Sequence, residues 1–319
     1  MSDPVIDPAH AIPAASALRR SRFRWRIVAF IALVIAILAG AGRFATENGL
    51  GGFGGIASDG IARVIIDGTI ATDPVRLKMF ETLADNDSVK AVVLAINSPG
   101  GTTAGGEELY ESIGKLRAKK PVVAYVKELG ASAAYMTAIA ADRIFVRRLS
   151  LVGSIGVLFQ TTDASKLLDI IGLNLDKVAS GPLKAEPDIG HPMTPEVRAS
   201  LQSIVDDSFS WFVDVVAERR GLTRAEVLPL ADGRILTGNQ GIAAKLADEV
   251  GGEAEAIAWL EANKSIKADL PVSTWYPIAQ PDWTDPVKWL GGQARSALGL
   301  PAQGPVVLDG LVSLWQVAP

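Results

Sequence analysis

Short apolar runs alternate with amphipathic segments between residues 61 and 148, and this alternation constrains the fold more than any other feature of the sequence. The apolar, often β-branched runs that are typical of buried strands occupy 61–70, 89–96 and 121–126, and the segment "RIFVRR" (143–148) is predicted as a further strand. Apolar residues at helical spacing occupy 74–85, 106–118 and 131–141. Strands that alternate with helices form βαβ units around a mostly parallel sheet, so the predicted fold class is α/β.

Two small-residue stretches follow directly after predicted strands. The stretch "NSPGG" (97–101) comes after the apolar run 89–96, and "ELGAS" (128–132) comes after 121–126. In parallel sheets, ligands bind at the carboxyl ends of the strands. These two stretches are therefore the first places where we expect a functional site.

The composition excludes several kinds of chemistry. The chain has no cysteine and two histidines among 319 residues, which removes thiolate nucleophiles, disulfides and histidine-rich zinc sites. Its net charge of −4 gives no basic surface for nucleic acid. The glycine pairs lack the lysine and hydroxyl residues of a phosphate-binding loop. We expect no metal, no other cofactor and no nucleic-acid partner.

An uncharged apolar run, 27–42, lies near the N-terminus. With its flanking residues it reaches the length of a membrane-spanning helix, which we place at 25–45. Arginines crowd the segment before the run, whereas Arg43 follows it. The tail 1–24 is therefore expected in the cytoplasm, and the rest of the chain across the membrane. The alternative is a cleaved signal sequence, cut near the small residues 39–41.

The rest of the chain divides into three segments. Residues 46–60 are rich in glycine and are expected to form a flexible linker, and residues 61–262 form the globular body. Residues 263–319 carry tryptophans among prolines and glycines and are expected to pack on another surface as a tail. Within the body, a long helix is predicted, and its segment 208–216 should present an apolar face that suits contact between copies of the chain. We therefore expect a homo-oligomer.

Ser132 lies between a glycine turn and a run of small, helix-forming residues. At the first turn of a helix, its own amide and that of Ala133 would lie beside its hydroxyl, where they favour a developing oxyanion. The glycines of "NSPGG" offer further backbone amides. The alternative is that Ser132 only caps the helix, as serines often do.

A nucleophilic serine needs a base. His10 lies on the cytoplasmic side of the predicted span, which leaves His191 or a lysine. Lys184 lies in a glycine- and proline-rich stretch among small residues, where burial would keep an amine neutral. A solvated lysine and a loop histidine are the ordinary interpretations of these two residues, so the local sequence leaves the base open.

Five motifs, in this order, resemble the signal peptide peptidase family, the bacterial SppA-type serine peptidases. They are "INSPGG" (96–101), "GASAAYMTAIAADRIF" (130–145), "GSIGVL" (153–158), "SGPLKAEP" with "HPMTPEVRASLQ" (180–202), and "GRILTGNQGIAAKLADEVGG" (233–252). The resemblance runs from about residue 61 to residue 260 and fits the short, single-repeat form of the family.

This resemblance implies a crotonase/Clp protease-like spiral of βαβ units and a Ser-Lys dyad. Ser132 matches the nucleophile of the family, and Lys184 matches the general base. Ser154 matches a serine that orients the lysine.

The resemblance also implies an oxyanion hole. Gly101, Gly100 and the amide of Ala133 match its donors. The family more often has two glycines directly after the nucleophile, whereas this chain has Ala133 and Ala134. Alanine keeps the backbone N–H donor, so the oxyanion hole should be retained. Its methyl group would narrow the pocket, which affects the expected substrate preference.

The sequence therefore predicts a membrane-anchored serine endopeptidase that degrades cleaved signal peptides and other membrane-associated peptides. Its body would lie on the periplasmic side of a bacterial inner membrane, with the N-terminus in the cytoplasm. The alternatives are an acyl-CoA enzyme of the same fold superfamily and a catalytically inactive scaffold protein. A further alternative, the membrane Ser-Lys proteases of the stomatin-operon type, usually carries additional spans.

Overall fold

The computed structural model describes residues 30, 32–33, 58–277 and 311–314, and the chain divides into two units, Met1–Gly55 and Ile56–Pro319. The predicted cytoplasmic tail 1–24, most of the predicted span 25–45 and the linker up to residue 57 lie outside the described residues. Phe30, Ala32 and Leu33 are helical and exposed. Among the residues described, no helix combines the length and the apolar composition that crossing a membrane requires.

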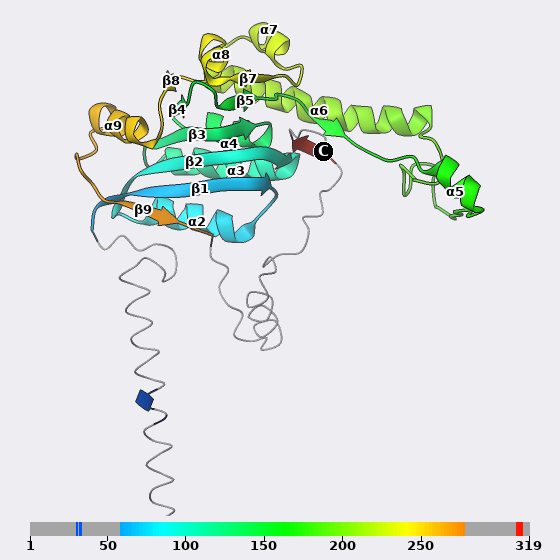
Figure 1. Cartoon of the computed structure of the whole chain (residues 1–319), viewed down its shortest axis with the longest axis horizontal. Helices are drawn as coiled ribbons and strands as arrows, with labels where there is room; N and C mark the ends of the chain where they lie inside the picture. The colour runs from blue at the N-terminus through cyan, green and yellow to red at the C-terminus, as the bar shows by residue number, and fades with distance from the viewer. Residues whose placement is uncertain (1–29, 31, 34–57, 278–310, 315–319) are drawn as a thin grey trace, which may run out of the picture. The chain divides into compact units, whose positions relative to one another are not determined.

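The second unit alternates strands and helices along the chain (Figure 1). Its first half contains β1 (Gly60–Ile70), α2 (Pro74–Asp85), β2 (Val89–Thr102), α3 (Thr103–Arg117), β3 (Val122–Ala131), α4 (Ala133–Ile139), β4 (Arg143–Val146), β5 (Leu151–Gly153) and β6 (Leu158–Phe159). Its second half contains α5 (Ser165–Ile171), α6 (Pro195–Arg220), α7 (Arg224–Val227), the 3₁₀ helix η2 (Leu228–Leu230), β7 (Ile235–Thr237), α8 (Gly238–Ala243), β8 (Glu249–Val250), α9 (Glu253–Asn263), β9 (Val272–Trp275) and β10 (Leu311–Leu314).

One sheet joins these strands, and most of its pairings are parallel. The parallel pairs are β1 with β2 and β9, β3 with β2, β4 and β5, and β4 with β8. The antiparallel pairs are β10 with β2, β10 with β6, and β5 with β7. The prediction of an α/β fold with a mostly parallel sheet is therefore confirmed.

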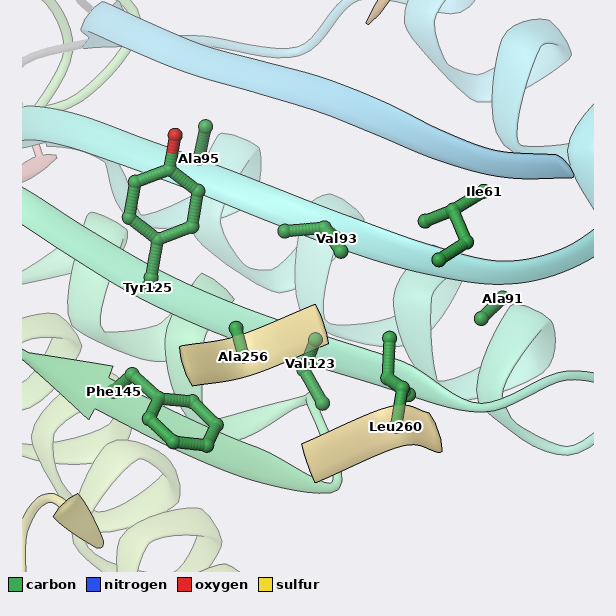
Figure 2. Packing of buried hydrophobic residues seen from close by; sticks show 9 residues of the cluster. All are labelled: Ile61, Ala91, Val93, Ala95, Val123, Tyr125, Phe145, Ala256 and Leu260. Carbon is green, nitrogen blue, oxygen red and sulfur yellow. The ribbon is translucent and has the colours of Figure 1, made fainter. Parts of the chain in front are cut away.

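The central strands are buried on both faces. On one face, alternate residues of β2 (Ala91, Val93 and Ala95) pack in one cluster with Ala256 and Leu260 of α9 (Figure 2). The intervening residues of β2 point to the opposite face, because side chains alternate along a strand. There α3 and α4 pack against β2. This two-sided burial explains why the strand reads as a continuous apolar run.

Strand β2 is longer than the sequence predicts. The apolar run ends at residue 96, but β2 continues through "NSPGG" to Thr102. Its pairing with β3 shifts register between Ile96 and Ser98, and its last residues pair with β1 and β10. The partners that keep this segment extended lie far away in the sequence, and local turn residues give no sign of them.

The prediction of an exposed apolar face at 208–216 is wrong. Phe212, Val213, Val215 and Val216 are buried, because α6 packs on α4 within the chain. Exposed large apolar side chains gather instead on α5 and on the segment between α5 and α6. They are Leu167, Ile170, Ile171, Leu173, Leu175, Val178, Leu183 and Ile189.

The C-terminal residues add two strands to the sheet. Strand β9 runs parallel to β1, and Trp275 at its end is buried. Strand β10 pairs with β2 and β6. Two described parts of the predicted tail 263–319 are thus integral to the sheet, whereas 278–310 and 315–319 lie outside the described residues.

We expect Leu260→Ala to lower the free energy of unfolding by about 2–5 kcal/mol, because Leu260 is fully buried between α9 and the sheet. Chemical denaturation, followed by circular dichroism, measures this change. The matched control is Leu149→Ala, which alters a leucine that is 81% exposed and should change the free energy by no more than about 0.5 kcal/mol. Equal effects of the two substitutions would contradict the packing of α9.

Candidate active site

Ser132 occupies a strained turn between β3 and α4. It is the N-cap residue of α4, with φ 58° and ψ −120°, and it is 1% exposed. This is a backbone conformation that residues other than glycine rarely adopt, and holding it costs about 1–3 kcal/mol. The Ser132 side chain makes no capping hydrogen bond to α4. The alternative that Ser132 serves only as a helix cap is therefore not supported.

Main-chain hydrogen bonds hold this turn on both sides. The Ser132 amide donates to the Gly153 carbonyl of β5 at 2.9 Å. The Ser132 carbonyl accepts from the amides of Tyr135 at 2.8 Å and Met136 at 3.0 Å. The expectation that the Ser132 amide faces a developing oxyanion is therefore wrong, since this donor binds β5. The amide of Ala133 remains a candidate, because the first residues of a helix have no acceptor within the helix.

Helix α4 is fixed by buried contacts along its length. Ala133 and Ala134 are fully buried, and the Tyr135 hydroxyl donates to the Leu246 carbonyl at 2.8 Å. Burial raises the pKa of Tyr135 above its usual value, so the phenol stays a neutral donor. At the other end of α4, the Arg219 guanidinium donates to the carbonyls of Ile139 and Ala141, both at 2.8 Å. These contacts hold the Ser132 end of the helix in one position.

The glycines of "NSPGG" lie at the end of β2. Gly100 has φ 102°, and its amide donates to the Ser98 hydroxyl at 3.1 Å. A Cβ on Gly101 would lie 1.7 Å from the Ile70 carbonyl oxygen, so only glycine fits this close approach of β1. The Gly100 amide thus has a partner within its own strand, while Gly101 pairs with Ile70 of β1 and stays a candidate donor of the oxyanion hole.

Ser154 directly follows β5, the strand whose Gly153 carbonyl accepts a hydrogen bond from the Ser132 amide. It has φ 49°, is 7% exposed, and donates its amide to the Arg234 carbonyl at 2.7 Å. Strands β3 and β5 pair up to Ala131 and Gly153, so the two serines leave adjacent strand ends. The fold therefore brings Ser132 and Ser154 together with Ala133 and the glycines of β2.

Lys184 lies on a different part of the chain. It is exposed in the loop 172–194 between α5 and α6, and its amide donates to the Gly181 carbonyl at 3.1 Å. In Figure 1, α5 and this loop extend away from the sheet. Helix α5 has no buried residue. A single chain therefore presents this lysine to solvent, whereas Ser132 is buried.

A polar cluster fixes the residues that directly follow Lys184. The Lys177 ammonium donates to Glu186 Oε1 at 2.6 Å, to Asp188 Oδ2 at 3.0 Å and to the Ala185 carbonyl at 3.3 Å. The hydrogen bond to Glu186, and then that to Asp188, raise the pKa of Lys177. The hydrogen bond from Lys177 in turn lowers the pKa of Glu186. The loop after Lys184 is thus closed by one cation between two carboxylates.

The carboxylates of this cluster also bind the loop backbone. The amide of Asp188 donates to Glu186 Oε2 at 3.1 Å, and the amide of Gly190 donates to Asp188 Oδ1 at 2.8 Å. His191 Nε2 lies 3.4 Å from Glu186 Oε1. The sequence gives no sign of this role of Lys177, because a lysine and two carboxylates spaced along a loop form no recognisable motif.

Comparison with known proteins assigns a family to this sequence. The profile described as Peptidase family S49 matches residues 114–267. A protease-named protein of Methanocaldococcus jannaschii is 39% identical over 58% of this chain and 60% of its own length. A protease-named protein of Synechocystis sp. is 34% identical over 62% of this chain and 72% of its own. A protein of Enterococcus faecium, named as a signal peptide peptidase SppA, is 31% identical over 60% of this chain and 56% of its own.

These matches confirm the resemblance that the motifs indicate, although they span only part of each relative. Among solved structures, a ClpP1 mutant from Listeria monocytogenes aligns at 15% identity and a TM-score of 0.43, covering 61% of this chain and 94% of that chain. That score is too low to establish a common fold. The crotonase/Clp spiral therefore stays a prediction.

We expect Ser132→Gly to be more stable than Ser132→Ala by about 1 kcal/mol, since glycine adopts a positive φ without strain and alanine does not. Both substitutions remove the hydroxyl, so each is the control for the other. Denaturant unfolding of the two variants measures the difference. Equal stability, or a more stable alanine variant, would show that the turn is not strained.

We expect Lys177→Met to loosen the loop after Lys184, because the carboxylates of Glu186 and Asp188 lose the cation that holds them. Hydrogen exchange at the amides of Asp188 and Gly190 should become faster, while exchange in α9 stays unchanged. The control Lys177→Arg keeps the charge and should keep most of the protection. Unchanged exchange in the methionine variant would mean that the cluster does not order the loop.

Proposed function

This chain belongs to peptidase family S49 and is a serine-type peptidase, and from that premise we propose that Ser132 and Lys184 are its catalytic dyad. The proposed activity is that of an endopeptidase, and its main substrates are cleaved signal peptides. The name of the Enterococcus faecium relative supports this substrate class. The family membership counts against the acyl-CoA enzyme and the inactive scaffold.

The observation that carries this proposal is the strained turn at Ser132. A buried serine with φ 58° is held there by hydrogen bonds to β5 and within α4, although another residue would fit with less strain. Strain of this kind is common where a side chain must be presented in one fixed direction. A serine on a tight strand-to-helix turn is the arrangement that aims a hydroxyl at a carbonyl carbon.

The proposed reaction is acyl transfer through Ser132. The neutral amine of Lys184 takes the proton from the Ser132 hydroxyl as its oxygen attacks the peptide carbonyl carbon. The amides of Gly101 and Ala133 donate to the oxyanion of the tetrahedral intermediate. Lys184 then gives the proton to the leaving amine, and water hydrolyses the acyl-enzyme by the same steps in reverse.

Ser154 is proposed to accept a hydrogen bond from the Lys184 ammonium and so to orient it. Its buried place beside the Ser132 turn supports this role. In this role Ser154 acts on the base and not on the substrate.

The exposure of Lys184 bears directly on this mechanism. A lysine acts as a base only when its amine is neutral, which removal from water favours. In the single chain Lys184 is exposed, so the proposal requires another surface to cover it. The exposed apolar side chains of α5 and its following loop support a second copy of the chain as that surface. A homo-oligomer is therefore part of the proposed function.

The proposed setting is a bacterial inner membrane. The apolar segment 25–45 anchors the chain, with residues 1–24 in the cytoplasm and the peptidase body on the periplasmic side. An anchored peptidase in this place meets signal peptides and other membrane-associated peptides as they are released. The alternative of a cleaved leader would give the same body without the anchor.

We expect Lys184→Ala to lower kcat for hydrolysis of a fluorogenic peptide by about 10²–10⁴-fold, because it removes the general base. Ser132→Ala should abolish turnover and also labelling by a serine-reactive phosphonate. His191→Ala is the matched control, since His191 lies in the same loop, and it should largely retain activity. Turnover that survives in Lys184→Ala but is lost in His191→Ala would assign the base to the histidine instead.

A further inference from the structure

A largely buried arginine holds the main chain at the end of β1. Ala71 directly follows β1, and its carbonyl oxygen accepts a hydrogen bond from the guanidinium of Arg76 in the first turn of α2. The Arg76 side chain is 13% exposed. Glu108 of α3 lies beside it, with Oε1 3.6 Å from the guanidinium, and the same oxygen accepts from the Asp73 amide at 2.9 Å. The end of β1 is therefore fastened to both α2 and α3.

The main chain that Arg76 holds packs directly on a candidate oxyanion donor. Ile70, the last residue of β1, pairs with Gly101, and a Cβ on Gly101 would lie 1.7 Å from the Ile70 carbonyl oxygen. Ala71 packs in the same way on the first turn of α3, where a Cβ on Gly105 would lie 2.7 Å from the Ala71 carbonyl carbon. Because no side chain separates these backbones, a displacement of Ala71 is passed on to Gly101.

The surroundings of Arg76 are unfavourable for a charge whose only role is to stabilise the fold. Arg76 Nε is buried and has no hydrogen-bond partner among the residues described. Burial lowers the pKa of Arg76 in spite of the nearby carboxylates of Asp73 and Glu108. Replacing both partners of such an ion pair by uncharged side chains often costs no stability. What the guanidinium does supply is a rigid donor that fixes the direction of the Ala71 carbonyl.

We propose that Arg76 is a positioning residue for the oxyanion hole. Through the Ala71 carbonyl it holds the end of β1, and thereby keeps the Gly101 amide in the orientation that binds the tetrahedral oxyanion. This inference rests on the proposed function, in which Ser132 is the nucleophile and Gly101 an oxyanion donor. Loss of a whole oxyanion donor lowers kcat by about 10²–10³-fold, so a displaced donor loses part of that factor.

The first test compares Arg76→Met with the wild-type full chain in the hydrolysis of a fluorogenic peptide. A displaced donor weakens binding of the transition state but not of the peptide, so kcat should fall by about tenfold or more while KM stays within about twofold. Arg76→Lys keeps a cation that can donate to the Ala71 carbonyl, and it should recover most of the lost kcat. An unchanged kcat in Arg76→Met, or equal losses in the two variants, would overturn the proposal.

A second measurement reports on the oxyanion hole itself. A peptide boronic acid adds the Ser132 oxygen to boron as the hydroxyl proton passes to the base, which gives a tetrahedral anion like the reaction intermediate. In Arg76→Met the inhibition constant of this compound should rise by the same factor by which kcat falls. Binding of the uncleaved peptide, measured in the Ser132→Ala background, should stay unchanged. Equal weakening of the boronic acid and the peptide would contradict the proposal, because it would show a general loss of the peptide site.

A double variant separates positioning from folding. Arg76→Met with Glu108→Gln leaves neither charge without its partner, so it should keep the denaturation midpoint of the wild-type chain and still show the loss of kcat. The matched control is Lys78→Met, which removes an exposed cation of the same helix and should change neither quantity. A double variant with wild-type kcat would show that Arg76 does not position the site.

These outcomes separate the inference from the proposed function. If the wild-type chain neither cleaves the peptide nor binds the boronic acid, and Ser132 is not labelled by a serine-reactive phosphonate, the proposed function itself fails. If the wild-type chain does both and Arg76→Met equals it in both, Ser132 remains the nucleophile and only the role of Arg76 is wrong.

Discussion

The hydrogen bond from the Ser132 amide to the Gly153 carbonyl is the contact on which the candidate site depends. It extends the pairing of β3 and β5 by one residue past Ala131, to the residue at which the chain turns with a positive φ. It therefore holds the start of α4 against β5 and keeps Ser132 next to the strand that Ser154 follows. A turn fixed by the sheet has few other conformations, which is what a reactive side chain on it requires.

The same strand ends explain why the site lies where it does. Parallel strands end at one edge of the sheet, so residues that follow β2, β3 and β5 meet although they are far apart in the sequence. Burial on both faces of the sheet holds those strands rigidly, with α9 on one side and α3 and α4 on the other. Gly101 at the end of β2 allows the close approach of β1 that a side chain would prevent.

One chain supplies the nucleophile side of the proposed dyad but leaves the base exposed. Lys184 lies on a loop that the Lys177 cluster orders, next to apolar side chains that the described part of the chain does not bury. Ion pairs near the surface contribute little stability by themselves, so the value of this cluster is in shaping the loop. An ordered but exposed loop suits a contact between copies better than a contact within one chain.

The sequence by itself determined the α/β class, the burial of β2 and β3, and the turn at Ser132, because these depend on local periodicity and on residues that neighbour each other in the chain. The glycine and serine motifs also indicated the family, since their order and spacing can be read directly from the sequence. Only the tertiary structure decided that the Ser132 amide binds β5, that 208–216 is buried against α4, and that β10 pairs with the end of β2. Each of these rests on contacts between segments distant in sequence, whose pairing depends on the shape of the folded sheet and leaves no local pattern.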